Sequence, residues 1–391
     1  MAQAVGPDLV GDEHVVTGFP DQSQLSLPTR LVVETSAAAD VALRTAAATL
    51  VTASAAPLVL SRRAMTDDRE SLEFYADLAA AADPERTFPR PDPGCRVESR
   101  EVTRLPSLRR GRRRGRVELL HFESRFEVVN PAFRKRYARR RRNRTAWAQH
   151  WRHADGPRPT LGVIHGFMAS PYWVNRAFFS LPWFYRRGYD VLLYTLPYHG
   201  RRRSRLEPFS GYGLFAGGIA NFCEAMCNAV HDFRVFVDHL ESLGAPAVGL
   251  TGLSLGGYTT ALLAATDDRL HVAIPNAAVT DLSTLVNQWA PAGQLLSLGL
   301  RLHQTPRSLV DHALSVHSPL TYPCLVPKDR RFIIAGLGDR LAPPEQSEAL
   351  WEHWDRCLVH WFPGNHTFHV RQGTYLKQMA RFLDATGFNA R

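Results

Sequence analysis

The chain has 391 residues, of which 45% are hydrophobic and 21% charged, and its formal charge is +10. These proportions are those of a soluble globular protein that can bury a sizeable core. The five cysteines include no C-x-x-C pair, which argues against a disulfide framework and for a reducing compartment, so we expect a cytoplasmic protein. The positive charge comes almost entirely from arginine, with only three lysines among the 47 basic residues, and we expect no nucleic-acid partner.

Residues 1–83 are rich in alanine and have a mildly helical pattern, clearest in Ser71–Ala82. The start of the chain has neither a basic segment nor an apolar stretch, so we expect no signal peptide. Thr45–Ser61 is too short and too rich in Ala, Thr and Ser for a membrane span, and it contains Pro57. We predict a buried or surface helix there, with no transmembrane segment but with room for peripheral membrane contact.

A proline-rich stretch, Asp83–Gly94, predicts a linker. The sequence therefore divides into an N-terminal helical extension with its linker, residues 1–95, and a larger domain, residues 96–391. The larger domain begins with a predicted strand over Arg116–Val128. Arginine clusters lie on both sides of this strand, at Arg109–Arg116 and Arg134–Arg144, and we interpret both as solvated loops or helix faces.

Apolar strands and helices alternate regularly after residue 157. This pattern predicts a mostly parallel sheet with helices on both faces, that is, an α/β fold. Long helical patterns cover Pro171–Arg187 and Leu214–Leu243. The predicted strands are Thr160–Ile164, Tyr189–Leu196, Ala247–Leu253, Leu270–Ala278, Arg331–Leu337 and Cys357–Phe362.

A G-x-S-x-G pattern centres on Ser254, directly after the apolar strand Ala247–Leu253 and before a predicted helix. A serine at such a sharp strand-to-helix turn needs small neighbours, which Gly252 and Gly256 supply. The pattern predicts a nucleophile elbow with Ser254 as the nucleophile. The amide of Leu255 would then be one of the two N–H donors that a tetrahedral oxyanion needs.

The second donor is expected upstream, where His165 and Gly166 follow the strand Thr160–Ile164. The amide of Phe167 is the candidate, and its side chain has no part in this prediction.

A serine nucleophile needs a general base and a residue to orient it. In the chain order Ser, acid, base, Asp339 follows one predicted strand and His366 follows the next. We predict Asp339 and His366 in these roles. His369 is an alternative base, and Asp281 is an alternative acid, although its sequence context also fits a helix N-cap.

Together, His165-Gly166, the G-x-S-x-G pattern, Asp339 and His366 resemble the α/β-hydrolase superfamily over about residues 105–391. The segments Pro197–Arg202 and Leu250–Gly257 resemble its abhydrolase-domain-containing 18 branch. The resemblance implies an α/β-hydrolase fold and, between about residues 280 and 328, a helical cap insertion. In such a cap, apolar residues would offer a wall to an acyl chain: Trp289, Leu295, Leu296, Leu298 and Leu300.

A third arginine cluster, Arg201–Arg205, follows the strand Tyr189–Leu196 at the sheet edge where ligands bind in such folds. Our hypothesis is that Arg201 and Arg202 meet a substrate carboxylate or phosphate.

These residues predict a serine hydrolase, a carboxylic ester hydrolase of the esterase or lipase kind. It would work through an acyl-enzyme on an ester with an apolar acyl group, without a metal or an organic cofactor. The alternatives are a peptidase or thioesterase with the same residues, or a non-catalytic protein that binds anions or nucleic acid on a hydrolase fold.

Overall fold

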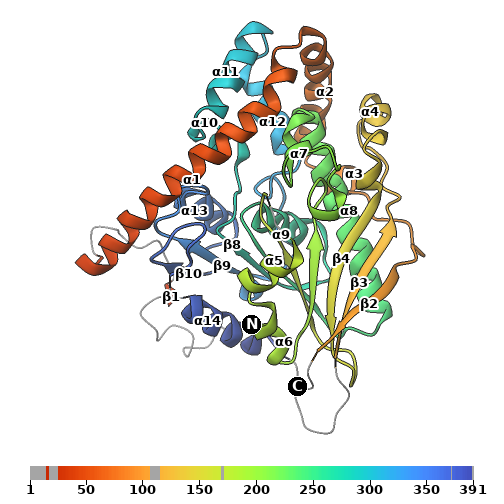
Figure 1. The fold of residues 1–391 in the computed structure, drawn as a ribbon, viewed down its shortest axis with the longest axis vertical. Coiled ribbons are helices and arrows are strands. Elements are labelled where there is room, and N and C mark those ends of the chain that lie inside the picture. Colours follow the sequence, from red (N-terminus) through yellow and green to blue (C-terminus); the bar gives the residue numbers. More distant parts are fainter. Residues whose placement is uncertain (1–14, 17–24, 106–114, 169–170, 371, 390–391) are drawn as a thin grey trace.

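The computed structural model describes residues 15–16, 25–105, 115–168, 171–370 and 372–389. The arginine cluster Arg109–Arg116 lies outside these ranges except for its last two residues. In the described part of the chain a ten-stranded sheet has the order β1-β10-β9-β8-β7-β5-β6-β4-β3-β2 (Figure 1). The strands are β1 (Val15–Val16), β2 (Glu98–Arg104), β3 (Arg116–Glu123), β4 (Thr145–Arg152), β5 (Thr160–Ile164), β6 (Asp190–Thr195), β7 (Val248–Leu253), β8 (Leu270–Asn276), β9 (Phe332–Gly336) and β10 (Leu358–Phe362).

The strands from β10 to β6 are parallel to one another. β1 at one edge and the series β4, β3 and β2 at the other pair antiparallel. The predicted mostly parallel sheet is confirmed. The strand order reverses at β5, because β6 and β7 lie on opposite sides of it, and the carboxyl ends of β5 and β7 form the crevice where open α/β sheets bind ligands.

Side chains alternate between the two faces of the sheet, as the pleat requires. In β6, Leu192 and Tyr194 belong to one hydrophobic core, whereas Val191 and Leu193 belong to the other. The first core is covered by α8 (Ile219–Ser242), α9 (Leu255–Thr266) and α13 (Pro344–His353). The second is covered by α6 (Leu181–Arg186) and α14 (Gln372–Ala385).

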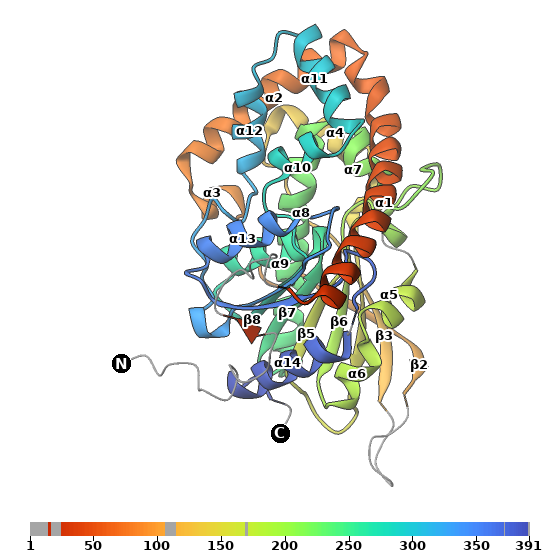
Figure 2. The ribbon, with the colours of Figure 1, turned by 90° about the vertical axis from the view of Figure 1, so that its left-hand side faces the viewer.

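Three helices follow β8 and lie beyond the carboxyl edge of the sheet, in agreement with a helical cap (Figures 1 and 2). They are α10 (Leu282–Gln288), α11 (Ala292–Leu302) and α12 (Arg307–Ser315). The N-terminal helices α1 (Leu27–Val59) and α2 (Arg62–Ala81) pack against them. Leu72 and Tyr75 of α2 belong to the first core, so no gap in the packing marks the predicted boundary at residue 95, which stays a prediction.

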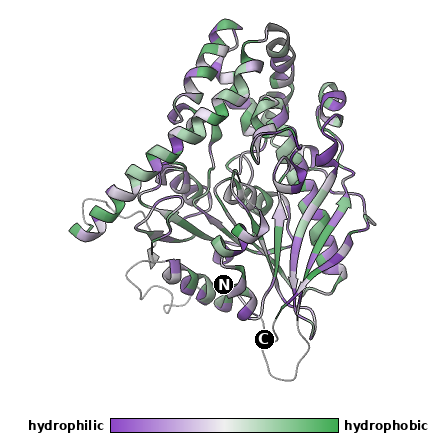
Figure 3. Ribbon diagram, in the orientation of Figure 1, coloured by the Kyte–Doolittle hydropathy of each residue, from purple (hydrophilic) through white to green (hydrophobic). Residues whose placement is uncertain are grey.

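Helix α1 is longer than the sequence indicated. It has 33 residues, and by length and composition alone it could cross a membrane; 17% of its most apolar window is buried in the protein. In Figure 3 hydrophobic residues recur along both α1 and α11. Several of them are exposed, among them Leu31, Leu43, Leu50 and Leu302.

Other elements differ from the sequence-based expectations in detail. The expected linker contains a short helix, α3 (Pro84–Thr87), whose N-cap Asp83 accepts hydrogen bonds from two backbone amides. The helical pattern Pro171–Arg187 is divided into α5 (Tyr172–Phe178) and α6, and Leu214–Leu243 is divided between α7 (Tyr212–Ala216) and α8. The cluster Arg134–Arg144 lies on α4 (Arg134–Ala138) and two short 3₁₀ helices, Pro131–Phe133 and Arg141–Arg144.

Candidate active site

Ser254 stands between β7 and α9 in a backbone conformation that few residues adopt, with φ 58° and ψ −118°. Its N–H donates to the carbonyl of Asn276 (3.0 Å), and its carbonyl accepts from Tyr258 in the first turn of α9 (2.8 Å). A non-glycine residue at positive φ costs of order 1–3 kcal/mol, and such strain persists where the surroundings enforce it. The half-buried Ser254 is therefore held at the tip of a sharp turn.

The glycines of the G-x-S-x-G pattern have no room for a side chain. A Cβ on Gly256 would collide with the carbonyl oxygen of Ile164 and lie 2.7 Å from that of His165. A Cβ on Gly252 would lie 2.8 Å from the Thr260 hydroxyl. The first turn of α9 is therefore packed directly onto the end of β5.

The loop after β5 lies against Ser254. A Cβ on Gly166 would come 3.4 Å from the Cβ of Ser254. The imidazole of His165 fixes this loop, since its Nε2 accepts from Leu196 N–H (3.1 Å) and its Nδ1 lies 2.9 Å from the Gly166 carbonyl oxygen. Burial lowers the pKa of His165 to about 4, so the ring is neutral and has a structural role.

The two predicted amide donors come from elements on either side of Ser254. Leu255 is the first residue of α9, where backbone N–H groups have no partner within the helix. Phe167 follows Gly166, and its ring packs edge-on against Phe215, with 5.1 Å between the ring centroids.

Asp339 and His366 lie in the loops after β9 and β10, and the structure brings them together. His366 Nδ1 is 2.6 Å from Asp339 Oδ2. The other oxygen, Oδ1, accepts from the amides of Leu341 (2.9 Å) and Ala342 (2.8 Å), which fixes the carboxylate. Among the described residues no hydrogen bond joins His366 to Ser254. Such contacts are often long before substrate binds.

The environment of His366 favours its charged form. Burial alone would lower the pKa of this imidazole, but the charge of Asp339, the hydrogen bond to it and the charge of Asp40 outweigh burial, and the pKa is raised above its usual 6.5. A carboxylate that stabilises the imidazolium is what a general base requires of its orienting partner.

The two alternative residues have other partners. Asp281 caps α10 by accepting from the amide of Thr284 (3.1 Å). His369 Nδ1 is 2.7 Å from the Tyr375 hydroxyl, and burial lowers its pKa to about 4.

One residue at this site was not predicted from the sequence. Asp40 of α1 accepts hydrogen bonds through Oδ2 from the backbone amides of Arg340 (3.0 Å) and His366 (2.9 Å). The available signal was a carboxylate in the middle of an apolar, alanine-rich helix, whose other acidic residue, Glu34, lies near its start. Its partners lie about 300 residues away in sequence, so nothing local identified them.

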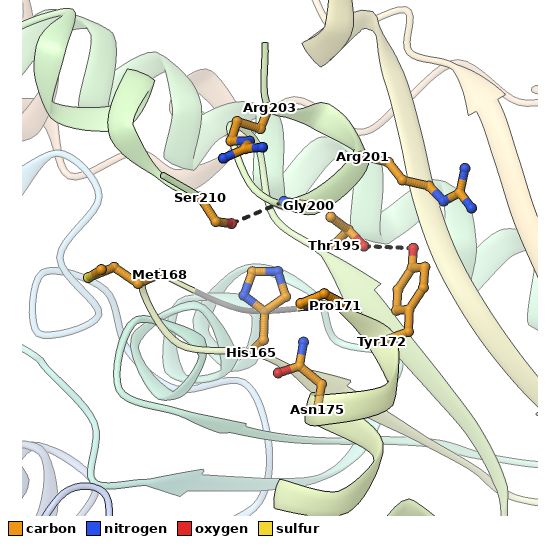
Figure 4. Close-up of a pocket in the computed structure, with 10 residues that line it drawn as sticks. All are labelled: His165, Met168, Pro171, Tyr172, Asn175, Thr195, Gly200, Arg201, Arg203 and Ser210. Carbon is orange, nitrogen blue, oxygen red and sulfur yellow. Dashed lines mark hydrogen bonds between the residues drawn. The ribbon is translucent and has the colours of Figure 1, made fainter. Parts of the chain in front are cut away.

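A polar cavity of about 530 Å³ lies beside the loop after β5 (Figure 4). In the figure Arg203 and Ser210 lie on its upper side, whereas Arg201 extends away from His165. The guanidinium of Arg201 lies over the ring of Trp147, 5.1 Å from its centroid. The lining residues are His165, Met168, Pro171, Tyr172, Asn175, Thr195, Gly200, Arg201, Arg203 and Ser210.

Arg202 does not reach this cavity, which corrects its expected role. Its side chain is fully buried and ion-paired with Asp232 of α8 at 2.8 Å. It also donates to the carbonyl of Asn143 (2.6 Å) and to the side chain of Asn228 (3.0 Å). A guanidinium with these partners stabilises the fold and is not available to a substrate anion.

A second cavity, of about 180 Å³, lies between α1, the cap helices and the start of α8, and its lining is almost entirely apolar. Of the five cap residues expected to form an apolar wall, Trp289, Leu295 and Leu296 line it. Leu298 is 41% exposed and Leu300 is buried, and neither belongs to the lining. Helix α1 contributes Val51, Thr52, Ala55, Leu58 and Val59.

Comparisons with known proteins identify the family and the fold. A sequence model of the "Alpha/beta hydrolase family" matches residues 163–383. Two uncharacterized proteins of Mycobacterium tuberculosis, from strains CDC 1551 / Oshkosh and ATCC 25618 / H37Rv, are each 31% identical over 306 residues, which are 76% of this chain and 69% of theirs.

Two solved structures share the fold. Acetyl xylan esterase 1 from Thermoanaerobacterium sp. JW/SL YS485 has a TM-score of 0.52 at 15% identity and covers 81% of this chain and 94% of its own. The acetyl xylan esterase from Paenibacillus sp. R4 has a TM-score of 0.52 at 16% identity and covers 80% and 94%.

Proposed function

Since the chain belongs to the alpha/beta hydrolase family, we propose that it is a serine hydrolase whose reaction is the hydrolysis of a carboxylic ester. The observation that carries this proposal is the hydrogen-bonded pair of His366 and Asp339 at the same edge of the sheet as the strained Ser254. Nothing in the proposed reaction requires a metal or an organic cofactor.

The reaction would proceed in two half-reactions. Ser254 Oγ attacks the ester carbonyl while His366 takes its proton, and the amides of Phe167 and Leu255 hold the oxyanion. Collapse of the tetrahedral intermediate breaks the ester bond, and His366 gives its proton to the departing alcohol. Water, deprotonated by His366, then attacks the acyl-enzyme, and the carboxylic acid leaves as Ser254 recovers its proton. Asp339 orients His366 throughout.

The apolar cavity supports a substrate with an apolar acyl group. Phe215 lines the cavity and also contacts Phe167, whose neighbour Gly166 lies against Ser254. The Phe215–Phe167 contact therefore links the cavity wall to the loop that lies against Ser254. An acyl chain placed there would lose its contact with water, which stabilises binding by roughly 0.8 kcal/mol per buried methylene.

The polar cavity supports a different role, in binding the leaving group. Arg203 and Arg201 bring positive charge to a cavity whose wall includes His165. With Arg202 excluded, we propose that Arg203 would meet a carboxylate or phosphate on the alcohol part of the substrate, and that Arg201 would join it by leaving the ring of Trp147, over which its guanidinium lies. Equal rates for neutral and anionic esters, unchanged in Arg203→Ala, would argue against this role.

We also infer a cytoplasmic location and no nucleic-acid partner. All five cysteines are free thiols, which a reducing compartment maintains. The exposed apolar residues of α1 would allow the protein to bind peripherally to a membrane.

The test of the proposed function uses short p-nitrophenyl esters and a fluorophosphonate probe. Ser254→Ala is expected to abolish both hydrolysis and labelling. Ser242→Ala, which changes an exposed serine at the end of α8, is the matched control and should retain both. Full activity in Ser254→Ala would refute the proposal.

The same assay distinguishes the related reactions, since peptidases and thioesterases use the same residues. Ester, thioester and amide substrates with one common acyl group should give the highest kcat/KM for the ester. A wild-type protein that neither turns over these substrates nor reacts with the probe would indicate a non-catalytic protein on this fold.

A further inference from the structure

One face of α1 carries a row of polar residues at four-residue intervals: Ser36, Asp40 and Arg44. Residues four apart in a helix lie one above the other on the same face. All three are bound to the loops that hold the acid and the base. Asn365 donates to the carbonyl of Ser36 (2.7 Å), and Arg44 donates to the carbonyl of Arg340 (3.2 Å).

Asp40 is the centre of this row and joins the two loops to each other. Its Oδ2 accepts from the backbone N–H of Arg340, next to Asp339, and from the backbone N–H of His366 itself. The carboxylate of Asp40 therefore binds the residue that follows Asp339 and binds His366 itself. The two loops are also joined directly, by the hydrogen bond from Gly338 N–H to the carbonyl of Gly364 (2.8 Å), and Asp40 adds a second link beside Asp339 and His366.

The position of Asp40 is unfavourable for a purely structural residue. The residue is 1% exposed, and its Oδ1 is buried with no hydrogen-bond partner among the described residues. Burying a carboxylate with one oxygen unsatisfied is destabilising. Burial accordingly raises the pKa of Asp40, against the two amide hydrogen bonds, which lower it. An apolar residue would serve better if packing α1 were its whole purpose.

We propose that Asp40 is a positioning residue of the active site, supplied by the N-terminal helix, which holds the loops of Asp339 and His366 in register. Asp40 lies on α1, outside the segment matched by the family model, 163–383. The expected changes in kcat and in the pH profile rest on the proposed function. The expected change in the pKa of His366 does not.

Asp40 also acts on His366 through its charge. The charged and titratable groups around this pair are Asp339, His369, Arg44 and Arg340. The two carboxylates, Asp339 and Asp40, both raise the pKa of His366, whereas His369 and His366 disfavour each other's charge. Removing the charge of Asp40 while keeping its oxygen should make His366 easier to deprotonate.

Two substitutions separate the two effects. Asp40→Asn keeps an acceptor oxygen and removes the charge, whereas Asp40→Ala removes both. In Asp40→Ala the loops lose their common partner, and we expect kcat on p-nitrophenyl butyrate to fall about 100-fold with little change in KM, as a small misplacement of reacting groups does. In Asp40→Asn we expect kcat to stay near the wild-type value at alkaline pH. We also expect the acid limb of its kcat/KM profile to lie at lower pH than in the wild type.

The matched control is Glu34→Gln, which removes an exposed charge from the same helix, where Glu34 pairs with Arg30 at the surface. It should leave kcat, KM and the pH profile unchanged. Wild-type kcat and an unchanged acid limb in Asp40→Ala would overturn the proposal, even if its Tm is lower.

A measurement without substrate keeps the inference testable should the protein prove not to be an esterase, or should Asp40→Ala fail to fold. NMR of the histidine rings gives the pKa of His366 directly in the wild type and in Asp40→Asn, with His366→Gln to assign the signal. We expect a lower pKa in Asp40→Asn. Equal values in the two proteins would show that Asp40 does not act on His366.

Discussion

Ser254 and His366 are both held in states that the isolated residues avoid. Ser254 has a positive φ because β7 and α9 leave the turn no other path, and Gly252 and Gly256 allow the close packing that this requires. His366 is buried, yet neighbouring carboxylates raise its pKa. Both departures are of the kind that accompanies function, because the surrounding structure has to enforce them.

The raised pKa of His366 predicts the pH dependence of the reaction. The base must be neutral to accept a proton, so kcat/KM should rise with pH through the folded-state pKa, with its acid limb above pH 6.5. Asp339→Asn should lower kcat about 10⁴-fold, because the ring loses its orienting partner, and should move the acid limb to lower pH. An acid limb below pH 6.5 in the wild type would contradict this assignment.

The same shift has a consequence for stability, whose sign follows from linkage. A histidine with a raised folded-state pKa binds its proton more tightly in the folded state. Its contribution to the free energy of unfolding is full below the unfolded pKa near 6.5 and is lost as pH rises through the folded value. As pH rises over that interval, the contribution of His366 to the free energy of unfolding therefore decreases while activity increases.

At the scale of elements, the parallel centre of the sheet was predictable because its signals are local. β5, β6, β7 and β9 are buried throughout, so each is a short apolar run that stands out in the sequence. β2 and β4 were missed. β2 is exposed along its whole length, and β4 mixes buried and half-buried residues, so their strand character depends on pairing with β3.

The error on Arg202 has a physical origin of the same kind. The sequence placed Arg201–Arg205 correctly after β6, but the direction in which each side chain points is set by the 3₁₀ helix Gly200–Arg202. This turn directs Arg202 inward to Asp232 and Asn228 of α8. Neighbouring arginines of this cluster thus differ in role: Arg202 binds the loop to α8, whereas Arg203 lines the polar cavity.

This difference can be measured. Arg202→Ala leaves Asp232 charged in the interior without its partner, and we expect a loss of about 3–5 kcal/mol in the free energy of unfolding. Arg203→Ala, on the half-buried neighbour, is the control and should change stability by less than about 0.5 kcal/mol. Urea denaturation of both variants tests the prediction, and equal stabilities would show that the buried pair adds nothing to the fold.

At the scale of the whole molecule, α1 connects two parts of the site that the sheet alone does not join. Its first half holds the loops of Asp339 and His366 through Asp40, and its second half forms one wall of the apolar cavity. In Figure 2 the helix runs from beside the sheet up to the cap helices. The N-terminal extension thus contacts both the loops of Asp339 and His366 and the apolar cavity.

The two faces of the second half of α1 allow a matched test of the acyl site. Ala55 lines the cavity, whereas Ala53 is exposed on the outer face. Ala55→Leu adds three carbons inside a volume of about 180 Å³, so long acyl chains should no longer fit in the cavity, whereas short ones still should. With p-nitrophenyl acetate, butyrate, octanoate and dodecanoate, we expect Ala55→Leu to move the best kcat/KM toward shorter chains and to leave the acetate rate unchanged.

Ala53→Leu adds the same side chain to the outer face and should keep the wild-type profile. Because unfolding or a displaced Asp40 would lower all four rates together, only a change in their ratio reports on the cavity. If the ratio is the same in both variants and the wild type, the acyl chain lies elsewhere, and the cavity between α1 and the cap has no part in choosing the substrate.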